Sequence, residues 1–183
     1  MNLVEIVNAT RTTIDEALVA RLVARVLEEE GVAGAEVAVS FVGERRIRAL
    51  NREHRGADEV TDVLSFPLED WEPGGGPAGG VTPGAAATPL ALAPDLGDVA
   101  AALEGAEGPP LLLGDVVVCV RRALRQARGD DLPPALELAV LLVHGTLHLL
   151  GYDHETDAGR MALRQAEVLE LVDWRGLVVA PSR

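Results

Sequence analysis

The sequence predicts an α+β protein in which about four strands pack with about five helices. Four segments alternate apolar and polar residues or run as β-branched stretches, which is typical of strands. Five other segments have the length and the residue pattern of helices. The chain has 183 residues, of which 48% are hydrophobic and 25% are charged, and this composition suits one globular domain with its own core.

The first part of the chain accounts for two strands and one helix. Residues 2–7 alternate apolar and polar side chains, and residues 36–42 do so with β-branched ones, so both segments are predicted strands. Between them, Thr12 or Thr13 is expected to cap a helix that ends near Gly31. The apolar residues of this helix share one side, which predicts that this side is buried.

An arginine-rich helix and a third strand follow. Residues 43–55 place Ile47 and Leu50 inward at helical spacing, with charged residues on the rest of the surface. Residues 60–66 are predicted to form a strand, because they are rich in β-branched and apolar residues. Pro67 closes this strand, since proline cannot donate a backbone hydrogen bond to a neighbouring strand.

The C-terminal part of the chain supplies one buried strand and three helices. Residues 111–120 form a nearly continuous apolar run, as expected for a strand that is covered on both faces. Helices are predicted over residues 120–128, 133–150 and 155–172. With these elements the whole chain, residues 1–183, is predicted to be a single domain.

One segment stands apart from this pattern. Residues 71–110 are rich in glycine and proline and contain no basic residue. Such a composition buries too little apolar surface to offset the entropy lost on ordering. We therefore expect a mobile insertion within the domain.

The cysteine content and the apolar stretches of the sequence indicate the cellular compartment of the protein. The only cysteine, Cys119, excludes an internal disulfide framework and a zinc site built from several cysteines. The N-terminal residues lack the basic and apolar blocks of a signal peptide, and the most apolar stretch, residues 132–151, contains two prolines, a glutamate and two histidines. We therefore expect a cytoplasmic protein without a membrane span.

Charge is unevenly distributed along the chain. The net charge of −13 disfavours a protein that coats nucleic acid through its overall charge. All 16 basic residues are arginines, whose planar guanidinium can hold a phosphate through two hydrogen bonds. Two short segments hold most of them: Arg45, Arg46, Arg48, Arg52 and Arg55, then Arg121, Arg122, Arg125 and Arg128. These clusters are either solvated helix faces or surfaces that track a phosphate backbone.

Three of the four histidines lie in the segment HGTLHLLGYDH at 144–154. His144 and His148 are one helical turn apart, so both rings can reach the same metal ion. Gly151 permits a left-handed turn, which returns the chain and lets His154 approach the pair. Three neutral imidazoles leave the fourth tetrahedral position of the ion open, as in catalytic sites.

The same histidine spacing occurs in zinc peptidases, where a glutamate after the first histidine acts as the general base. Here that position is Gly145, so a peptidase of this kind lacks its proton acceptor. A metallopeptidase-like hydrolase stays an alternative only if another segment supplies the base.

Three segments together resemble the YbeY family, bacterial endoribonucleases involved in ribosomal RNA maturation. HGTLHLLGYDH resembles its histidine motif. LNREHRGADEVTDVLSFP at 50–67 resembles its Asn-x-x-Tyr/Phe-Arg and Thr-Asp-Val-Leu-Ser-Phe-Pro block, and LGDVVV at 113–118 resembles its Leu-Gly-Asp-Ile block. Met161 and Glu167 extend the resemblance into the last predicted helix. The resemblance implies a zinc-hydrolase-like fold with a mixed sheet of about four strands and the histidines beside it.

The chain departs from the family pattern at two places. His54 stands where the family usually has an aromatic residue before its arginine, and we expect this histidine at the surface rather than at the metal. The insertion at 71–110 is longer than the usual connection between the Phe-Pro and Leu-Gly-Asp blocks.

The resemblance also implies a function: a metal-dependent, single-strand-specific endoribonuclease in ribosomal RNA processing and ribosome maturation. One Zn²⁺ per chain is expected on His144, His148 and His154. Arg55 matches a functional arginine of the family, and Arg55 and His144 are the candidate catalytic residues. Ribosomal RNA and ribosomal particles or small-subunit proteins are the expected partners, without DNA or a membrane. A ribosome assembly factor without catalysis, in which the metal only ties helix to turn, is a further alternative.

Four polar residues near these motifs have two interpretations each. Thr61, Asp62 and Ser65 either line the cleft or make ordinary strand and turn contacts. Asp153 either orients a ligand histidine through a second hydrogen bond or caps the start of the last helix.

Overall fold

The computed structural model describes residues 1–68, 71–72, 76–77 and 111–179. In chain order the elements of this part are β1 (Leu3–Asn8), β2 (Thr13–Ile14), α1 (Glu16–Glu29), β3 (Ala35–Val42), α2 (Glu44–Arg55), β4 (Val63–Pro67), β5 (Trp71–Glu72), β6 (Gly76–Pro77), β7 (Leu111–Cys119), α4 (Val120–Gly129), α5 (Pro134–Leu149), α6 (Arg160–Leu171) and β8 (Val178–Val179). The described residues thus include five helices and the four strands of a central sheet, which confirms the predicted α+β class.

The central sheet has the strand order β1-β3-β7-β4. Strands β1, β3 and β7 are parallel, whereas β4 runs antiparallel to β7, so the sheet is mixed as the resemblance implied. Ser65 pairs with Val116 and Phe66 pairs with Asp115 across β4 and β7. The pairing therefore places two of the three family-like motifs side by side at one edge of the sheet.

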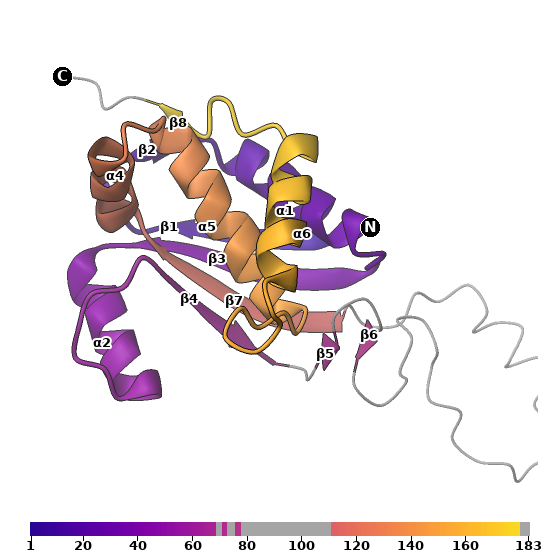
Figure 1. Cartoon of the computed structure of the whole chain (residues 1–183). Helices are drawn as coiled ribbons and strands as arrows, with labels where there is room; N and C mark the ends of the chain where they lie inside the picture. Colours follow the sequence, from indigo (N-terminus) through magenta and orange to yellow (C-terminus); the bar gives the residue numbers. More distant parts are fainter. Residues whose placement is uncertain (69–70, 73–75, 78–110, 180–183) are drawn as a thin grey trace, which may run out of the picture.

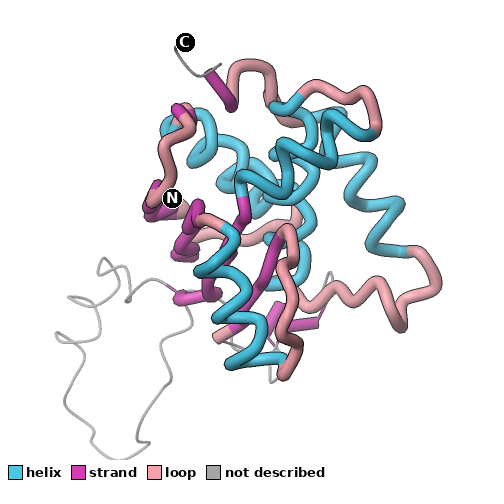
Figure 2. Tube along the Cα trace, turned by 90° about the vertical axis from the view of Figure 1, so that its left-hand side faces the viewer, coloured by secondary structure: helices cyan, strands magenta, loops and turns pink. Residues whose placement is uncertain are grey.

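Helices cover the two faces of the sheet unequally (Figure 1). The main core lies between the sheet and α1, α4 and α5, with α6 packed on α5. On the other face, α2 covers only part of the sheet through a small cluster that includes Ile47, Leu64 and the fully buried Cys119. Figure 2, seen from the side on which α2 lies, shows this helix apart from the other four. Of the residues of α2 only Ile47 and Asn51 are buried, so within the described part of the chain most of its surface is exposed.

Helix α5 is the central helix and carries the first two histidines of the motif. Pro134 lies in its first turn, where a missing N–H costs no hydrogen bond, and the helix ends at Leu149. It packs against β4, β7, α1, α4 and α6, so most of its circumference is buried. No helix in the described part of the chain has both the length and the apolarity that crossing a bilayer requires.

The predicted cap of the first helix is wrong. Helix α1 begins at Glu16, and Asp15 caps it because its Oδ1 accepts the backbone N–H of Leu18 at 2.9 Å. Neither Thr12 nor Thr13 serves this purpose, since β2, which contains Thr13, pairs antiparallel with β8. A strand partner from the far end of the chain cannot be inferred from local capping signals.

Two further boundaries differ from the prediction by several residues, and side-chain carboxylates explain both. Strand β4 begins at Val63 rather than at residue 60, because the Asp62 Oδ1 accepts the Val63 N–H at 2.9 Å in a local turn. Helix α6 begins at Arg160 rather than at 155. Before it, the carboxylate of Asp157 accepts the N–H groups of Gly159 and Met161 at 3.0 and 2.7 Å.

The expected insertion at 71–110 lies almost entirely outside the described residues. Only its first part is described: β5 pairs antiparallel with β6. Its predicted mobility and the single-domain organisation of residues 1–183 therefore stay predictions.

Candidate metal centre

The structure brings together the three histidines of the motif. His144 and His148 project from the same side of α5, and their Nε2 atoms lie 3.1 Å apart. Gly151 adopts a left-handed conformation with φ of 79°, which turns the chain back after the helix. The Nδ1 of His154 then lies 3.2 Å from the Nε2 of His148. The convergence that the spacing predicted is therefore present.

A second hydrogen bond fixes the orientation of each helical histidine. The Nδ1 of His148 lies 2.8 Å from the backbone carbonyl oxygen of Tyr152, and the Nδ1 of His144 lies 3.0 Å from the side-chain Oε1 of Gln165. Because a carbonyl oxygen only accepts, each Nδ1 carries the proton and donates it. The Nε2 of each neutral ring is then left with an unprotonated lone pair.

This geometry fits a bound cation. Two neutral Nε2 atoms 3.1 Å apart have no proton to share, so their lone pairs repel unless a positive ion lies between them. Nitrogen ligands about 2.0–2.1 Å from a tetrahedral zinc ion are about 3.3 Å apart, close to the separations found here. The ligand atoms of all three histidines lie within 4.8 Å of one another, and His154 is exposed, so one side of the cluster faces solvent.

The surroundings keep the two helical rings uncharged. Burial lowers the pKa of both His144 and His148, because a charged imidazolium loses hydration inside the fold. The neighbouring ring of His144 lowers the pKa of His148 further. Neutral imidazoles are the form that binds a metal, so the site needs little proton release on loading.

Gly145 is required by close packing. A Cβ at this position would lie 2.6 Å from Val116 Cγ1 and 3.2 Å from Ser65 Oγ. The residue after the first histidine therefore faces the sheet, where no side chain fits. This packing explains why a glutamate base of the peptidase type cannot stand at this position.

The polar residues before and within β4 make internal contacts. The carboxylate of Asp62 accepts hydrogen bonds from the N–H of Val63 and from Gln126 Nε2, both at 2.9 Å. The hydroxyl of Thr61 donates to Asp62, and the Ser65 hydroxyl donates to the carbonyl of Gly145 at 3.0 Å. The structure thus shows the turn and strand contacts of the second interpretation. The negative charge of Asp62 also reaches His144, whose pKa it raises against the larger effect of burial.

Asp153 caps a turn and does not orient a ligand. Its Oδ1 accepts the N–H of Glu155 at 3.1 Å, and its Oδ2 accepts the hydroxyl of Thr156 at 2.9 Å. The groups that orient the histidine rings are instead Tyr152 and Gln165, which the sequence prediction missed. The spacing of the motif held no signal for Gln165, because this residue comes from a different helix.

Arg55 is the last residue of α2, and its charge reaches the ring of His148. It is exposed, and it forms no hydrogen bond or ion pair with any other residue of the described ranges. Burial and the ring of His144 are the main causes of the low pKa of His148, and the positive charge of Arg55 lowers it further. This exposed guanidinium, whose charge acts on the His148 ring, is available to contact an anion.

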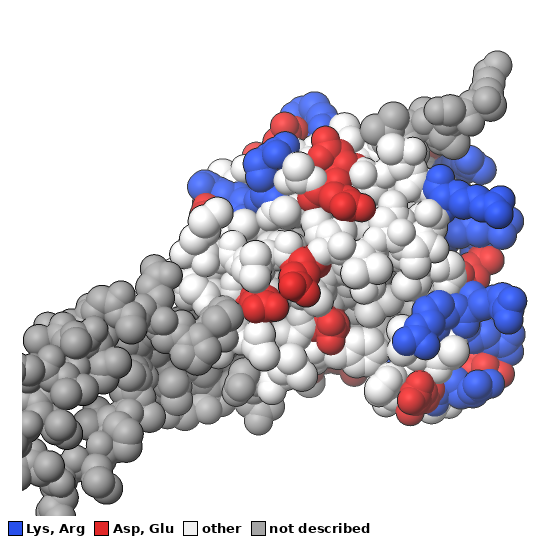
Figure 3. Space-filling view, turned by 180° about the vertical axis from the view of Figure 1, so that it is seen from behind, with Lys and Arg blue, Asp and Glu red and all other residues white. Residues whose placement is uncertain are grey.

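The other arginines of the two clusters fall into two groups. Some are paired: Arg48 donates two hydrogen bonds to Asp58 at 2.8 and 2.9 Å, and Arg125 is paired with Glu44. Others line a groove of about 580 Å³ between α2 and α4, which is formed by Gly43, Glu44, Arg45, Arg46, Ala49 and Arg121. Figure 3 shows basic side chains gathered on the edge of the molecule to which α2 and α4 belong. The two arginine clusters thus meet in space.

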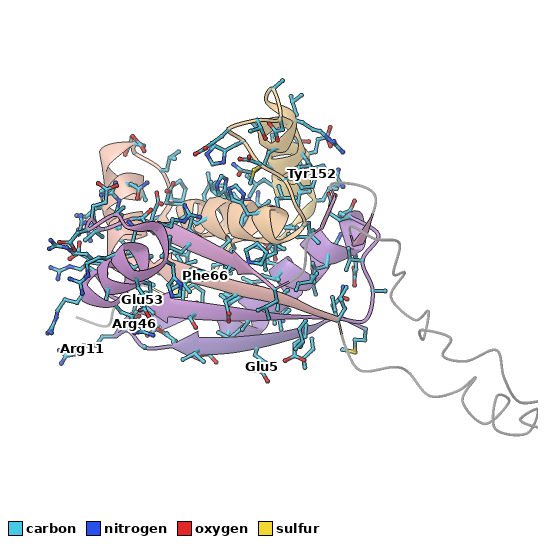
Figure 4. All side chains as sticks on the ribbon, turned by 90° about the horizontal axis from the view of Figure 1, so that it is seen from below. Glu5, Arg11, Arg46, Glu53, Phe66 and Tyr152 are labelled. Carbon is cyan, nitrogen blue, oxygen red and sulfur yellow. The ribbon has the colours of Figure 1, made fainter. Side chains whose placement is uncertain are left out.

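His54 lies outside the metal cluster, as expected. Its exposed ring packs edge-on against Phe66, with ring centroids 4.9 Å apart. Figure 4 shows Phe66 next to α2, which also carries Arg46 and Glu53. Within the described residues the three-histidine group contains only His144, His148 and His154.

A mixed sheet packed with helices, beside three converging histidines that face solvent on one side, is the arrangement expected of a metal-dependent hydrolase. The family model described as "Endoribonuclease YbeY" matches residues 5–173. The chain therefore belongs to the YbeY family, which confirms the resemblance of its motifs.

Relatives named "Endoribonuclease YbeY" support this assignment. The protein of Anaeromyxobacter sp. (strain Fw109-5) is 43% identical over 155 residues, a match that covers 84% of this chain and 61% of that protein. The chain thus spans less than two thirds of this relative. The Macrococcus caseolyticus protein is 41% identical, with 81% and 80% covered, and the Bacillus mycoides protein is 35% identical, with 92% and 94% covered.

A solved structure has the same fold. The solution structure of TM1509 from Thermotoga maritima aligns with a TM-score of 0.53 and 25% sequence identity. The alignment covers 92% of this chain and 87% of that one. The likeness therefore extends over the whole sheet and its helices rather than over the histidine motif alone.

Proposed function

We propose that this chain is a zinc-dependent endoribonuclease that hydrolyses phosphodiester bonds in single-stranded RNA during ribosomal RNA processing and ribosome maturation. The relatives' names and the family assignment support the reaction class. The absence of a membrane-spanning helix from the described residues is compatible with a cytoplasmic setting, which we include in the proposal.

The observation that supports this proposal most strongly is the histidine cluster. His144, His148 and His154 would hold one Zn²⁺, because two of their nitrogens are oriented as lone-pair donors and the third completes the set. When bound, such an ion lowers the pKa of a coordinated water and polarises a phosphoryl oxygen. The solvent-facing side of the cluster leaves room for the scissile phosphate. His144 thus belongs to both the metal-binding and the catalytic set.

Arg55 would contact the phosphate beside the metal. Its guanidinium has no competing partner among the described residues, so it can donate two parallel hydrogen bonds to phosphate oxygens. Donors placed where negative charge develops stabilise a transition state more than a ground state. We therefore assign Arg55 to charge stabilisation rather than to proton transfer.

The arginines that line the groove between α2 and α4 would track the RNA backbone away from the cut. These arginines form a local basic surface on a chain whose net charge is −13. The long-range attraction of the whole protein for RNA is therefore weak. We therefore propose that assembled ribosomal particles, or a small-subunit protein, present the RNA. Cleavage would then be confined to RNA that a ribosomal particle or a small-subunit protein already holds next to the site.

The metallopeptidase alternative loses support from the packing at Gly145. A peptidase base would have to come from another segment, and the position next to the first histidine is filled by Val116 and Ser65. The assembly-factor alternative predicts a metal that stabilises the fold without supporting RNA cleavage. Metal content and cleavage must therefore be measured together.

The deciding experiment compares the wild type with His148→Ala and His54→Ala. Metal content by mass spectrometry and cleavage of a single-stranded RNA and of ribosomal particles are measured on the same preparations. We expect one zinc ion per chain in the wild type and in His54→Ala, and loss of both zinc and cleavage in His148→Ala. Zinc-loaded wild-type protein that cuts neither substrate would contradict the proposed nuclease.

A further inference from the structure

Behind the histidine cluster lies a buried carboxylate that the proposed reaction does not use. Glu30 follows the last turn of α1, and its side chain is only 6% exposed. Its Oε2 accepts the hydroxyl of Tyr152 at 2.8 Å, and its Oε1 accepts the Nε of Arg164 at 2.5 Å. Both carboxylate oxygens are therefore satisfied, each by a different segment of the chain.

Tyr152 connects this carboxylate to one histidine. Its hydroxyl is bound to Glu30, while its backbone carbonyl accepts the Nδ1–H of His148. The residue is 5% exposed, and the guanidinium of Arg160 lies 5.5 Å from the centroid of its ring. Figure 4 shows Tyr152 between α6 and the end of α5. The hydroxyl and the ring face of Tyr152 are thus both held by neighbouring side chains. These contacts restrict the position of its backbone carbonyl.

Arg164 connects the same carboxylate to the other histidine. It donates to Glu30 and, through Nη2, to the backbone carbonyl of Glu29 at 2.9 Å. The next residue in α6 is Gln165, whose Oε1 accepts the Nδ1–H of His144. A helix docked to α1 by Arg164 therefore carries the amide that orients His144.

We propose that Glu30 is the shared positioning residue of the metal centre, acting on His148 through Tyr152 and on His144 through Arg164 and the adjacent Gln165. The inference rests on the proposed metal site and extends it to the end of α1. The two orienting groups come from different elements, the turn after α5 and helix α6, and Glu30 is hydrogen-bonded to one residue in each element, Tyr152 and Arg164. Partners that orient a ligand ring typically change metal affinity by about 10- to 100-fold.

The test measures the affinity of the protein for Zn²⁺ by competition with a chromophoric chelator. Tyr152→Phe removes the hydroxyl that is bonded to Glu30 but keeps the backbone carbonyl as a hydrogen-bond acceptor. Glu30→Gln keeps the shape of the side chain but removes its charge. We expect the Kd for Zn²⁺ to rise in each variant, by no more than the roughly 10- to 100-fold that is typical for loss of a group bonded directly to a ligand ring. With Co²⁺ in place of zinc, the visible absorption bands should shift, because they report the geometry of the ligand field.

A matched control separates this role from general stability. Asp15→Ala removes the cap at the other end of α1, where Asp15 accepts the N–H of Leu18 at 2.9 Å. It should lower the Tm of the metal-free protein while the Zn²⁺ affinity and the Co²⁺ spectrum stay as in the wild type. The double variant Tyr152→Phe/Glu30→Gln should weaken zinc binding by less than the product of the single effects, since both break one chain of contacts.

The outcomes distinguish the inference from the proposed function. Wild-type protein without measurable zinc affinity would overturn both. Tight zinc binding by the wild type with an unchanged Kd in Tyr152→Phe would overturn the positioning role alone, even if Glu30→Gln fails to fold. Equal loss of affinity in Asp15→Ala would also overturn it, because the effect would then follow stability and not orientation.

Discussion

The histidine cluster and the arginine-lined surface of α2 differ in how their side chains are held. Each helical histidine has a second hydrogen bond to a group from a neighbouring segment, at 2.8 and 3.0 Å. On α2, by contrast, Arg55 is exposed and has no partner among the described residues, and Arg48 is held only by the exposed Asp58. The histidine cluster is therefore the rigid side of the site, and the arginine-lined surface of α2 is the adaptable side.

This difference matches the two tasks of a nuclease. A metal ion needs ligands held at fixed distances, since small displacements weaken coordination. A nucleic-acid backbone varies in conformation and is held by charge, so long exposed arginines can follow it. Substitutions in the histidine cluster should therefore change metal affinity or stability. Substitutions on the arginine-lined surface of α2 should change only the binding and cleavage of RNA.

The largest expected effect on the adaptable side comes from Arg55→Ala. Losing one donor to a developing negative charge should reduce the rate of RNA cleavage about 10²- to 10³-fold. Zinc content and Tm should stay at wild-type values, because Arg55 takes no part in the described hydrogen bonds of the fold. Single-turnover cleavage assays and a thermal melt check these outcomes.

Arg52→Ala is the matched control for this prediction. Arg52 lies three residues earlier on α2, and its guanidinium is 3.9 Å from the carboxylate of Asp58. Its loss should slow cleavage by only a few fold. An equal loss in both variants would mean that the helix acts through its overall charge and that Arg55 has no special place.

Gly145→Ala tests the rigid side. The new methyl group would lie 2.6 Å from Val116 Cγ1, and such overpacking costs about 1–3 kcal/mol. Alanine regains about 1 kcal/mol through its higher helix propensity, so we expect a net destabilisation of up to about 2 kcal/mol in urea unfolding. Gly129→Ala is the control, because a Cβ there meets nothing within 4 Å, and this change should not destabilise the protein.

Arg121→Ala should have a smaller effect that depends on salt. Arg121 lines the groove between α2 and α4, where it would neutralise one phosphate. We expect the slope of log K against log salt for RNA binding to fall by about 1. Arg21→Ala on α1 should leave this slope unchanged. If both variants lower the slope equally, RNA is not bound at the groove.

The smallest predicted effect is a pH dependence at Glu137 on α5. Burial raises the pKa of its carboxyl above the ordinary value of 4.5, and the charges of Asp62 and Asp130 raise it further. The folded state then binds more protons than the unfolded state, so stability falls as pH rises above 4.5. Glu137→Gln should therefore be more stable than the wild type at neutral pH and equally stable below pH 4.5. Urea midpoints at both pH values check the sign.

The sequence predicted most of the sheet and the convergence of the histidines, because both follow from short-range patterns. Alternation marks strands, a four-residue spacing aligns His144 with His148, and Gly151 supplies the reversal that brings in His154. The zinc-ligand roles of these residues and the part played by Arg55 stay predictions that the proposed experiments address.

What could not be predicted depends on partners that are distant in the chain. The threonines expected to cap α1 instead belong to or precede a strand whose partner is β8. The hydrogen bond that was expected from Asp153 to a histidine goes to a local turn, and Gln165 and Tyr152 orient the rings instead. The pairing of Arg125 with Glu44 likewise arises only because α4 lies beside α2.

The bonds that radiate from Glu30 also set an order of assembly during synthesis. They join residues separated by 122 and 134 positions, and α1 leaves the ribosome before α6. The two histidines of α5 are therefore made before the amide of Gln165 that orients His144. A nascent chain cannot complete the geometry that orients these histidines until α6 has left the ribosome, so capture of the proposed metal ion must follow the synthesis of α6.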